Sequence, residues 1–521
     1  MRRLLLTTSA LALSLHAQPI ALGHAQQAFP ETVVTATRIP TPAERVPAAV
    51  TVLDRQDIEE RGYQTLAEAL QFVPGLRLVQ QGGPGQSATA FIRGAAGRQV
   101  LVLLDGAPLN DPSTPNAEFN FGNELLGDIE RIEVVRGPFS SLYGSGAIGG
   151  VVNLITRRAP PNTPFQAFGD LAGGTQRTVR GTLGAAGDTG TFDWMVAGQS
   201  FSSQGFNVTP PRLATNLGER DGLRAAAGTV RLGWRPLDGT RIEALLRWRE
   251  NTFGYDSVPR DVRNLHGDDR RWYGNLRAET TLFGIWTTGL RVAVTEDRRR
   301  YESLPTSLGA ANLNDAFRGT RTTYDWGNQV RLGAGGPFTD IALAFGATHE
   351  RESVDSASGS AFFRSVTNAS ANSTAFHAGA QGRLFERLDL SAGLRRDEAE
   401  GYDGFTSWRT GAVLAVPEAA SRLRAAAGTA FKAPSLFQRF GTIGATFRGN
   451  PDLDPETSFS WEVGSETDVR LFGRADFATL GATYFDTRFR DLITFNQTFS
   501  SLANIERARA RGVELSATVR P

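Results

Sequence analysis

The side chains that most often carry catalysis or bind metal ions are scarce in this chain of 521 residues. It has no cysteine, which excludes disulfides, thiolate metal sites and cysteine nucleophiles. A glycine-rich run at 144–150 lacks the Gly-Lys-Ser/Thr ending of a phosphate-binding loop. The histidines lack a metal-ligand spacing such as His-x-x-x-His; they are His16, His24, His266, His349 and His377. We therefore expect no enzymatic activity and no required cofactor.

Basic and acidic side chains nearly cancel, with 55 against 54 and a net charge of +1. This balance excludes a general nucleic-acid binder, which needs a positive surface. Lys432 is the only lysine, so the other 54 of the 55 basic residues are arginines. A mean hydropathy of −0.24 excludes a helical membrane bundle.

The first 25 residues predict a secretory signal peptide. Arg2 and Arg3 precede an apolar stretch, Leu4–Leu15, that is too short to span a bilayer. Small residues allow cleavage after Ala17 or Ala25, and the Gly-His-Ala sequence favours Ala25. The alternative is a buried N-terminal helix. Export together with the absence of cysteine suits a protein of the bacterial envelope.

Residues 39–158 mix helix and strand signals and predict a compact α+β domain. Thr65 is placed to cap a short amphipathic helix at 66–70, which ends before Pro74. Val100–Leu104 is a continuous apolar run and predicts a buried strand. Ile129–Val135 predicts another strand, which Gly137-Pro138 ends.

The pattern changes near residue 160. From 161 to 521, segments of about ten residues alternate with a period of two. In Arg241–Arg249, for example, apolar side chains occupy one face, whereas arginines and Glu243 occupy the other. Inward arginines are costly in a packed core, but they are ordinary beside a wet lumen when the apolar face meets lipid.

Long polar stretches, such as 205–224 and 298–322, alternate with short turns such as 236–239. Long outside loops and short periplasmic turns are typical of outer-membrane barrels. We therefore predict an all-β transmembrane barrel for 161–521. The alternative is a soluble propeller or sandwich, although repeats of about 40 to 50 residues, which favour a propeller, are not evident.

Five groups of motifs, in order along the chain, resemble the TonB-dependent outer-membrane receptors. They are Glu31-Thr32-Val33-Val34-Thr35-Ala36-Thr37-Arg38; Ile92-Arg93-Gly94 with Val100–Leu109; Ile129–Pro138 with Tyr143–Asn153; Phe431-Lys432-Ala433-Pro434-Ser435; and Gly449–Glu456. The first resembles the TonB box, the next two resemble the plug domain, and the last two resemble the barrel. Within the family, the chain is most similar to the cobalamin (vitamin B12) receptors.

The resemblance implies a signal peptide at 1–25, a TonB box at 31–38, a plug domain at 39–158 inside the lumen, and a barrel from 161. It implies a monomer in the bacterial outer membrane, surrounded by lipid, that imports a scarce ligand when the TonB–ExbB–ExbD complex pulls on the box. The box itself is β-rich and lies beside Pro40, so it could add as a strand to a partner's sheet. The alternative is an ordinary plug strand.

The family's plug arginines pair with barrel glutamates. Arg93 and Arg136 follow apolar residues and precede glycines, so we expect them to be buried and to need partners. Glu456 and Glu462 lie in the matching barrel segment and are the expected partners. The alternative is a solvated surface pair.

Two plug loops resemble the substrate loops of cobalamin receptors, at 80–89 and 110–116. Their amides and hydroxyls could bond an amide-rich ligand, and the candidates are Gln81, Gln86, Ser87, Thr89, Ser113, Thr114 and Asn116. The alternative is that these loop tips are solvated and have no ligand role.

Cobalamin receptors can order their outer loops with calcium held by an aspartate cluster. The matching residues here are Glu219, Asp221 and Asp256, whose oxygens suit Ca²⁺. Asn207 stands where an aspartate is expected, and Arg220 intrudes. Calcium is therefore an optional ion in this expectation.

Cobalamin is the leading ligand, and a ferric siderophore is the alternative within the family. A haem receptor would need a pair of outer histidines, for which only His266 is evident. A passive porin is the alternative from another class, but it would need neither a plug nor a TonB box.

The family barrel has about 22 strands. At roughly 20 residues per strand and connection, 161–521 holds about 16 to 18. Family members end in an aromatic residue on a closing strand, whereas this chain ends at Pro521. Because an open edge would expose unpaired N–H and C=O groups to lipid, we expect the final strands to be missing. The alternative is a smaller closed barrel.

Overall fold

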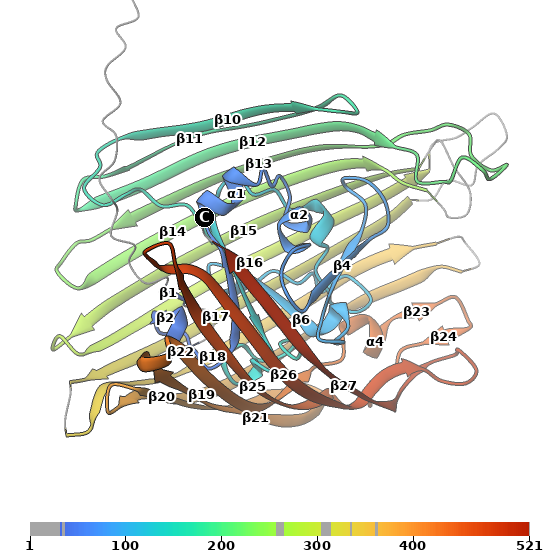
Figure 1. Ribbon diagram of the computed structural model, residues 1–521. Coiled ribbons are helices and arrows are strands. Elements are labelled where there is room, and N and C mark those ends of the chain that lie inside the picture. Colours follow the sequence, from blue (N-terminus) through green and yellow to red (C-terminus); the bar gives the residue numbers. More distant parts are fainter. Residues whose placement is uncertain are drawn as a thin grey trace, which may run out of the picture.

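The computed structural model describes residues 32–33, 37–256, 265–303, 314–333, 336–359 and 363–519. The predicted signal peptide lies outside these residues, as do Glu31, Val34, Thr35 and Ala36 of the predicted TonB box. An 18-stranded sheet curves around a smaller N-terminal domain, the plug, which is built on a five-stranded sheet (Figure 1).

The plug sheet has the order β3-β8-β9-β6-β7, with β6 and β9 parallel and the other pairs antiparallel. Its strands are β3 (Ala49–Leu53), β6 (Val100–Leu104), β7 (Ala107–Pro108), β8 (Ile129–Arg136) and β9 (Gly150–Thr156). The remaining plug elements are the β4 (Leu76–Gln80) and β5 (Ala88–Ile92) hairpin, α1 (Arg55–Glu60), α2 (Leu66–Leu70), α3 (Ser140–Tyr143), and 3-10 turns at Ala43–Arg45, Gly97–Gln99 and Phe121–Asn123.

Strand β6 is buried on both faces, as its unbroken apolar sequence predicts. Val102 packs into a core that also contains Leu66 and Leu70 of α2, whereas Leu103 packs into a second core with Phe139. Helix α2 begins where the sequence predicts, because the Thr65 side chain accepts a hydrogen bond from the Glu68 N–H. The plug therefore has one central sheet with apolar packing on both sides.

The large sheet is an antiparallel meander from β10 to β22, followed by β25 to β27. Its long strands are β10 (Gln166–Gly174), β11 (Thr178–Asp188), β12 (Phe192–Phe206), β13 (Asp221–Trp234), β14 (Thr240–Gly254), β15 (Leu265–Leu282), β16 (Trp286–Ser303), β17 (Asn314–Leu332), β18 (Phe338–Ser358), β19 (Ser365–Leu384), β20 (Leu388–Ala399), β21 (Tyr402–Val416), β22 (Ser421–Lys432), β25 (Glu456–Leu471), β26 (Arg474–Phe495) and β27 (Leu502–Val519). Short elements complete it: a 3-10 turn (Pro417–Ala419), α4 (Leu436–Phe440), β23 (Thr442–Ile443) and β24 (Phe447–Arg448).

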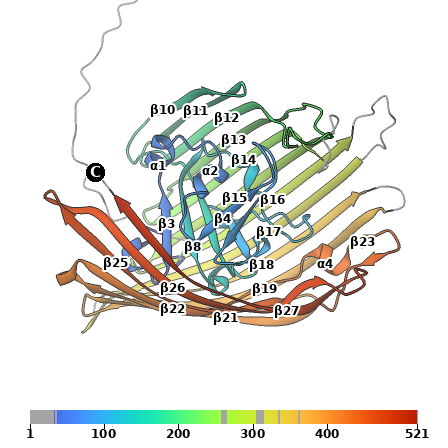
Figure 2. The same cartoon turned by 45° about the vertical axis from the view of Figure 1, so that its right-hand side comes forward.

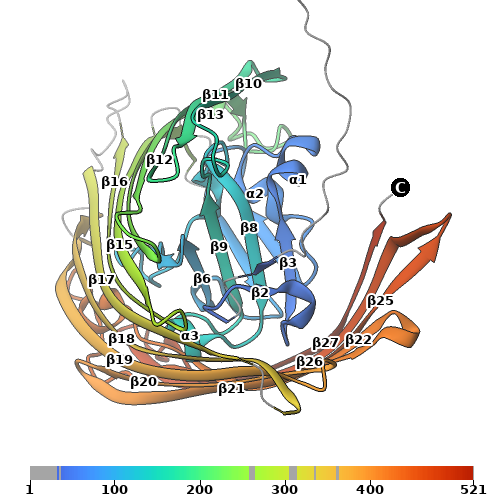
Figure 3. The ribbon, with the colours of Figure 1, turned by 90° about the vertical axis from the view of Figure 1, so that its left-hand side faces the viewer.

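The meander forms the barrel wall, and the plug lies on its concave side (Figure 3). One rim carries short turns, such as 282–286 and 384–388, and the other carries longer connections, such as 206–221. This asymmetry assigns the long-loop rim to the outside. Within the described residues, the edge strands β10 and β27 are not hydrogen-bonded to each other. In Figure 2 the strands of the wall run obliquely past the plug.

The two faces of each wall strand differ as the period of two predicts. On β16, Arg291 and Thr295 point inward and hydrogen bond to plug carbonyl groups, whereas Leu290 points outward and is 62% exposed. On β14, the predicted inward residues Arg247 and Arg249 are buried. No helix among the described residues has the length and apolarity needed to cross a bilayer.

Leu290 tests the orientation of the wall, because it lies midway along the apolar outward face of β16. Replacement of Leu290 by Arg should lower the free energy of unfolding by about 2 to 4 kcal/mol, since a lipid-facing cation at the bilayer midplane is costly. Denaturant titration in lipid vesicles measures this change. Leu282→Arg, outward at the end of β15, is the matched control and should cost about 1 kcal/mol or less. Equal costs for the two variants would contradict the assignment.

Candidate functional site

A cleft of about 270 Å³ opens toward the long-loop rim, between plug loops and the ends of β14–β16. Five of the predicted ligand residues line it: Gln81, Gln86, Ser87, Thr89 and Thr114. Ser113 and Asn116 do not. Ser113 is buried and donates a hydrogen bond to Asp111 Oδ1 at 2.7 Å, so it shapes its own loop instead.

The β4–β5 hairpin presents most of these residues, and its tip is fixed against the wall. Gln86 Nε2 donates to the Gly254 carbonyl oxygen at 2.6 Å. Gly85 has φ +90°, and a Cβ there would lie 3.0 Å from Leu223 and 3.1 Å from Phe253. Glycine is therefore required at the hairpin tip, where the backbone approaches the wall closely.

Aromatic side chains form the opposite wall of the cleft. Tyr255 and Tyr301 meet edge to face with centroids 5.5 Å apart, and Phe253 lies 6.2 Å from Tyr301. Sequence analysis missed these residues, although Phe253 and Tyr301 lie on the inward face at strand ends beside long loops. Their rings offer apolar surface and stacking faces to a ligand.

The cleft contains three arginines, and each has a carboxylate partner. Arg249 Nη2 lies 2.8 Å from Asp269, and Arg271 Nε lies 2.6 Å from Asp297. Arg299 Nε lies 2.9 Å from Asp111 of the plug. The cleft is therefore polar, but its cations are already neutralised.

Below the cleft, two plug carboxylates are buried against inward arginines of β14. Glu124 receives hydrogen bonds from Arg247 and, at 2.9 Å, from Arg249. Asp128 receives one from Arg247 at 2.6 Å and another from Thr229 at 2.6 Å. Sequence analysis missed both acids. The sequence does carry a hint of them. Glu124 and Asp128 stand in a mainly apolar stretch of the plug, and the strand at 241–249 has arginines on its inward face.

Burial alone would raise the pKa of both carboxyl groups, but the facing guanidinium groups outweigh it. The pKa values of Glu124 and Asp128 therefore lie below their usual values. In the unfolded chain these carboxyl groups have pKa values of about 4, and above that pH their ion pairs contribute fully to the stability of the fold. This contribution is lost as the pH falls through the lowered pKa values of the folded state. At neutral pH the network is fully charged.

A second network joins the plug turn after β6 to β13. Arg231 Nη2 lies 2.6 Å from Asp105 Oδ2, and Arg231 also hydrogen bonds to Thr156. Arg231 Nη1 lies 2.5 Å from Glu243 Oε1 on β14. The plug is thus held to β13–β16 by several buried guanidinium–carboxylate pairs.

A third network joins the plug to β25 and β27, and it includes three of the predicted ion-pair residues: Arg93, Arg136 and Glu462. Arg93 Nη1 lies 2.6 Å from Glu462, and its Nη2 lies 2.8 Å from Glu514. The pairing expected for Arg136 is wrong: its nearest carboxylate is Glu514, at 3.6 Å, and it also donates to the Pro74 carbonyl oxygen at 2.5 Å. Sequence analysis missed Glu514, which lies on β27.

Glu456 is paired differently from the expectation. It lies 2.7 Å from Arg98, rather than beside Arg93 or Arg136, and it also accepts from Gln99 Nε2 at 2.7 Å. The reason is geometric, because Glu456 begins β25 whereas Glu462 lies six residues further along the same strand. The two glutamates therefore meet different levels of the plug.

The described residues of the predicted TonB box contact the segment that follows them, and Arg38, the last residue of the box, also contacts the wall. Thr32–Val33 (β1) pairs with Thr41–Pro42 (β2), and Thr37 hydrogen bonds to Thr41. Arg38 Nη1 lies 3.2 Å from Asp325 on β17, and its guanidinium lies 5.2 Å from the Tyr143 ring centroid. A pull on the chain before Arg38 therefore acts directly on a plug–wall contact.

Comparisons with known proteins agree with this geometry. A family model described as "TonB dependent receptor-like, beta-barrel" matches residues 204–520, and one described as "TonB-dependent Receptor Plug Domain" matches 42–151. The chain belongs to the TonB-dependent receptor family. Members of this family are transporters and not enzymes.

Similar relatives include proteins named vitamin B12 transporter BtuB. The one from Vibrio vulnificus is 28% identical over 471 residues, which cover 89% of this chain and 72% of the relative. The one from Vibrio cholerae (El Tor Inaba) is 29% identical over 531 residues, covering 98% of this chain and 79% of the relative.

Similar solved structures establish the fold alone. A mutant ferric enterobactin receptor, PfeA from Pseudomonas aeruginosa, has a TM-score of 0.72 at 20% identity and covers 94% of this chain and 79% of its own. The siderophore receptor PiuA from Acinetobacter baumannii has a TM-score of 0.72 at 18% identity and covers 92% and 77%.

The three residues predicted to bind calcium lie near the outer loops of the receptor. Asp221 begins β13 and is buried, and Asp256 accepts a hydrogen bond from Thr209 Oγ1 at 3.0 Å. Within the described residues, no group of three or more acidic or histidine side chains is arranged to hold a metal ion. Calcium binding through Glu219, Asp221 and Asp256 stays a prediction.

Glu124 tests the network that holds the plug to the receptor wall. Replacement of Glu124 by Gln should lower the opening free energy of the plug by about 3 kcal/mol or more, because buried guanidinium groups lose their partner. Native-state hydrogen exchange of β6 and β9 amides measures this change. Glu59→Gln removes a carboxylate that is 56% exposed and should cost less than about 1 kcal/mol. Unchanged exchange in Glu124→Gln would show that the network does not hold the plug.

Proposed function

We propose that this receptor binds cobalamin at the outer cleft and imports it across the bacterial outer membrane into the periplasm. The observation that carries the proposal is the chemistry of the cleft, which combines amide and hydroxyl groups on the plug with aromatic rings on the wall. Cobalamin carries an amide-rich rim, which such groups can hydrogen bond. The relatives named vitamin B12 transporters, which align with nearly the whole chain, support the same ligand.

The charges of the cleft favour cobalamin over a ferric siderophore. Its three arginines are paired, and its acids outnumber them; the acids are Asp111, Glu118, Asp256, Asp269 and Asp297. An anionic iron chelate would meet net negative charge there, so its binding would be electrostatically disfavoured.

Energy for import would come from TonB, with ExbB and ExbD, through residues 31–38. A short β-rich segment can add as a strand to a partner's sheet, which transmits force along the chain. The contact of Arg38 with Asp325 would be the first plug–wall contact to carry that force. One chain contains both the cleft and the box, so a monomer suffices.

A ligand titration tests the substrate. Purified receptor should bind cyanocobalamin with a dissociation constant below about 1 μM and should bind ferric enterobactin more weakly. Gln81→Ala should weaken binding up to about tenfold, because it removes a hydrogen bond in the cleft. Asn116→Ala, which removes a plug-loop amide outside the cleft, is the matched control. Tighter binding of ferric enterobactin would instead assign a siderophore receptor.

Deletion of residues 31–38 tests active transport. The variant should bind cyanocobalamin as the parent does, because the cleft is remote from these residues, but it should not accumulate the ligand in cells. Uptake of radiolabelled cyanocobalamin in a host that lacks its own transporter measures this. Uptake at the parental rate would mean that the barrel is a passive pore.

A further inference from the structure

We propose that the floor of the outer cleft binds a primary carboxamide group of the ligand and rejects a carboxylate at the same place. The proposal rests on the proposed import function and adds the chemical selectivity of its binding site. The floor consists of Asn123 on the plug, Asp269 on β15 and Asp297 on β16, all of which line the cleft. Asp297 precedes Tyr301 by four residues on β16, so it lies deeper than the aromatic side of the cleft.

Carboxylates and guanidinium groups alternate where β14, β15 and β16 pass the floor. In register, Asp269 lies opposite Arg299, and Arg271 lies opposite Asp297. Arg249 on β14 lies opposite Arg271. All five side chains line the cleft. Both floor acids therefore have arginines as neighbours, as buried carboxylates require.

Each of the two floor acids has one oxygen bonded and one oxygen without a donor. Asp297 Oδ1 accepts from Arg271 Nε at 2.6 Å, whereas its Oδ2 is buried and has no donor among the described residues. Asp269 Oδ2 accepts from Arg249 Nη2 at 2.8 Å and from Asn123 Nδ2 at 3.1 Å. Its Oδ1 is buried and likewise has no donor within the described ranges. Each acid can therefore accept a further hydrogen bond although it already has an arginine partner.

The plug supplies a third acceptor of the same kind. Asn123 is 2% exposed and uses its Nδ2 to bond Asp269, and its Oδ1 has no donor in the part of the chain that the structure describes. Buried polar atoms in folded proteins almost always have a hydrogen-bond partner, from the protein or from a molecule bound to it. Three such oxygens beside one cleft indicate that the partner is a group that enters the cleft.

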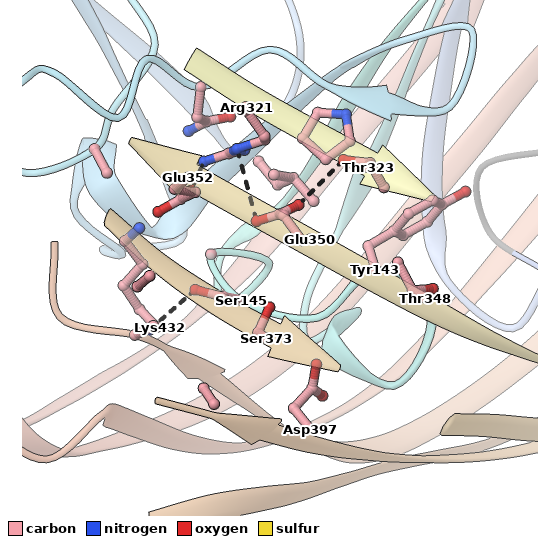
Figure 4. Close-up of a pocket in the computed structure, with 18 of the residues that line it drawn as sticks. Tyr143, Ser145, Arg321, Thr323, Thr348, Glu350, Glu352, Ser373, Asp397 and Lys432 are labelled. Atoms are coloured by element: carbon pink, nitrogen blue, oxygen red, sulfur yellow. Dashed lines mark hydrogen bonds and ion pairs between the residues drawn. The ribbon is translucent and has the colours of Figure 1, made fainter. Parts of the chain in front are cut away.

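A second cavity shows that this arrangement is particular to the cleft. Asp397 lies in an inner cavity between the plug and β16–β22 (Figure 4). It is as buried as the floor acids, but Arg395 Nε donates to its Oδ1 at 3.0 Å and to its Oδ2 at 2.9 Å. One arginine therefore satisfies both oxygens there. An unbonded oxygen is not a general consequence of pairing a buried wall aspartate with an arginine.

A primary carboxamide matches the hydrogen-bonding groups of the floor. Its NH₂ group offers two donors to the unbonded oxygens, and its carbonyl oxygen can accept from Arg271 Nη1, which has no acceptor among the described residues. A carboxylate lacks the N–H donors and would lie beside Asp269 and Asp297, so it would lose hydrogen bonds and meet repulsion. A site that hydrogen bonds a ligand N–H discriminates strongly against the analogue that lacks it.

The size of the cleft agrees with a single side group of the ligand. Its volume is about 270 Å³, whereas pockets that enclose a whole ligand have about 300 to 1000 Å³. A large ligand with several carboxamide arms would rest against the plug loops and the aromatic side of the cleft, and one arm would reach the floor. The floor then recognises one position of the ligand rather than its overall charge.

The monocarboxylic acids of cyanocobalamin, each with one side-chain amide hydrolysed, test this selectivity by calorimetric titration of the full receptor. One of them should bind at least about tenfold more weakly than cyanocobalamin, because its altered arm is the one that enters the floor. Asp297→Asn or Asp269→Asn should remove most of this difference, since the new amide donates to the carboxylate. Asp397→Asn changes a buried, arginine-paired aspartate outside the cleft and should keep the parental ratio.

Equal binding of cyanocobalamin and all its monocarboxylic acids by the parent receptor would overturn the selective floor. A parental ratio in both Asp297→Asn and Asp269→Asn would also overturn it. Failure of the parent receptor to bind cyanocobalamin itself would instead overturn the proposed function.

A second measurement requires no variant. The methyl ester of the discriminated acid is neutral but lacks the N–H donors, so it separates the loss of hydrogen bonds from charge repulsion. The parent receptor should bind this ester about two- to tenfold more weakly than cyanocobalamin, and more tightly than the acid. Binding of the ester as tightly as cyanocobalamin would overturn the hydrogen-bonded floor, even if the aspartate variants fail to assemble.

Discussion

The structure depends on one electrostatic constraint. A plug carboxylate that is buried inside the barrel must face a guanidinium group, and a buried plug arginine must face a carboxylate. An isolated buried charge would cost several kcal/mol, so each buried group must find a partner with good geometry. Arginine meets this need better than lysine, because its planar fork can bind two carboxylates at once. Arg247 does so with Glu124 and Asp128, and Arg93 with Glu462 and Glu514. The chain has only one lysine among its 55 basic residues, and this preference for arginine suits the paired interior.

The same constraint explains why the chain reads as polar although its wall faces lipid. Apolar side chains such as Leu290 face outward, where lipid replaces a protein core, and the charged residues face a lumen filled by the plug. The buried arginines of the wall strands, such as Arg231, Arg247 and Arg321, each lie beside an acid, which is consistent with the near-zero net charge. The acids come from the plug and from neighbouring wall strands.

Local features could be predicted from the sequence, whereas contacts between the two domains could be predicted only in part. The buried strand at Val100–Leu104, the Thr65 cap and the alternating faces of β14 depend on near neighbours, so their patterns are visible in the sequence. The partner of Glu456 depends on how far the plug is inserted into the wall, which no local pattern encodes. Arg98 and Arg93 are only five residues apart, yet they meet carboxylates at different levels. The aromatic wall of the cleft is equally non-local, because Tyr255 and Tyr301 come from different strand ends.

The uneven distribution of buried pairs also bears on how two distant events could be coupled. A ligand in the cleft would contact Asp111, Thr114 and Glu118 of the plug, whereas TonB would pull on residues 31–38, which end at Arg38. The coupling then requires no rearrangement of the central plug sheet, whose apolar packing on both faces makes it the most stable part of the domain. The ion pairs at β13–β16 and β25–β27 hold the plug to the wall on those two sides, so a coupling between the two events acts on a plug that stays anchored in the barrel.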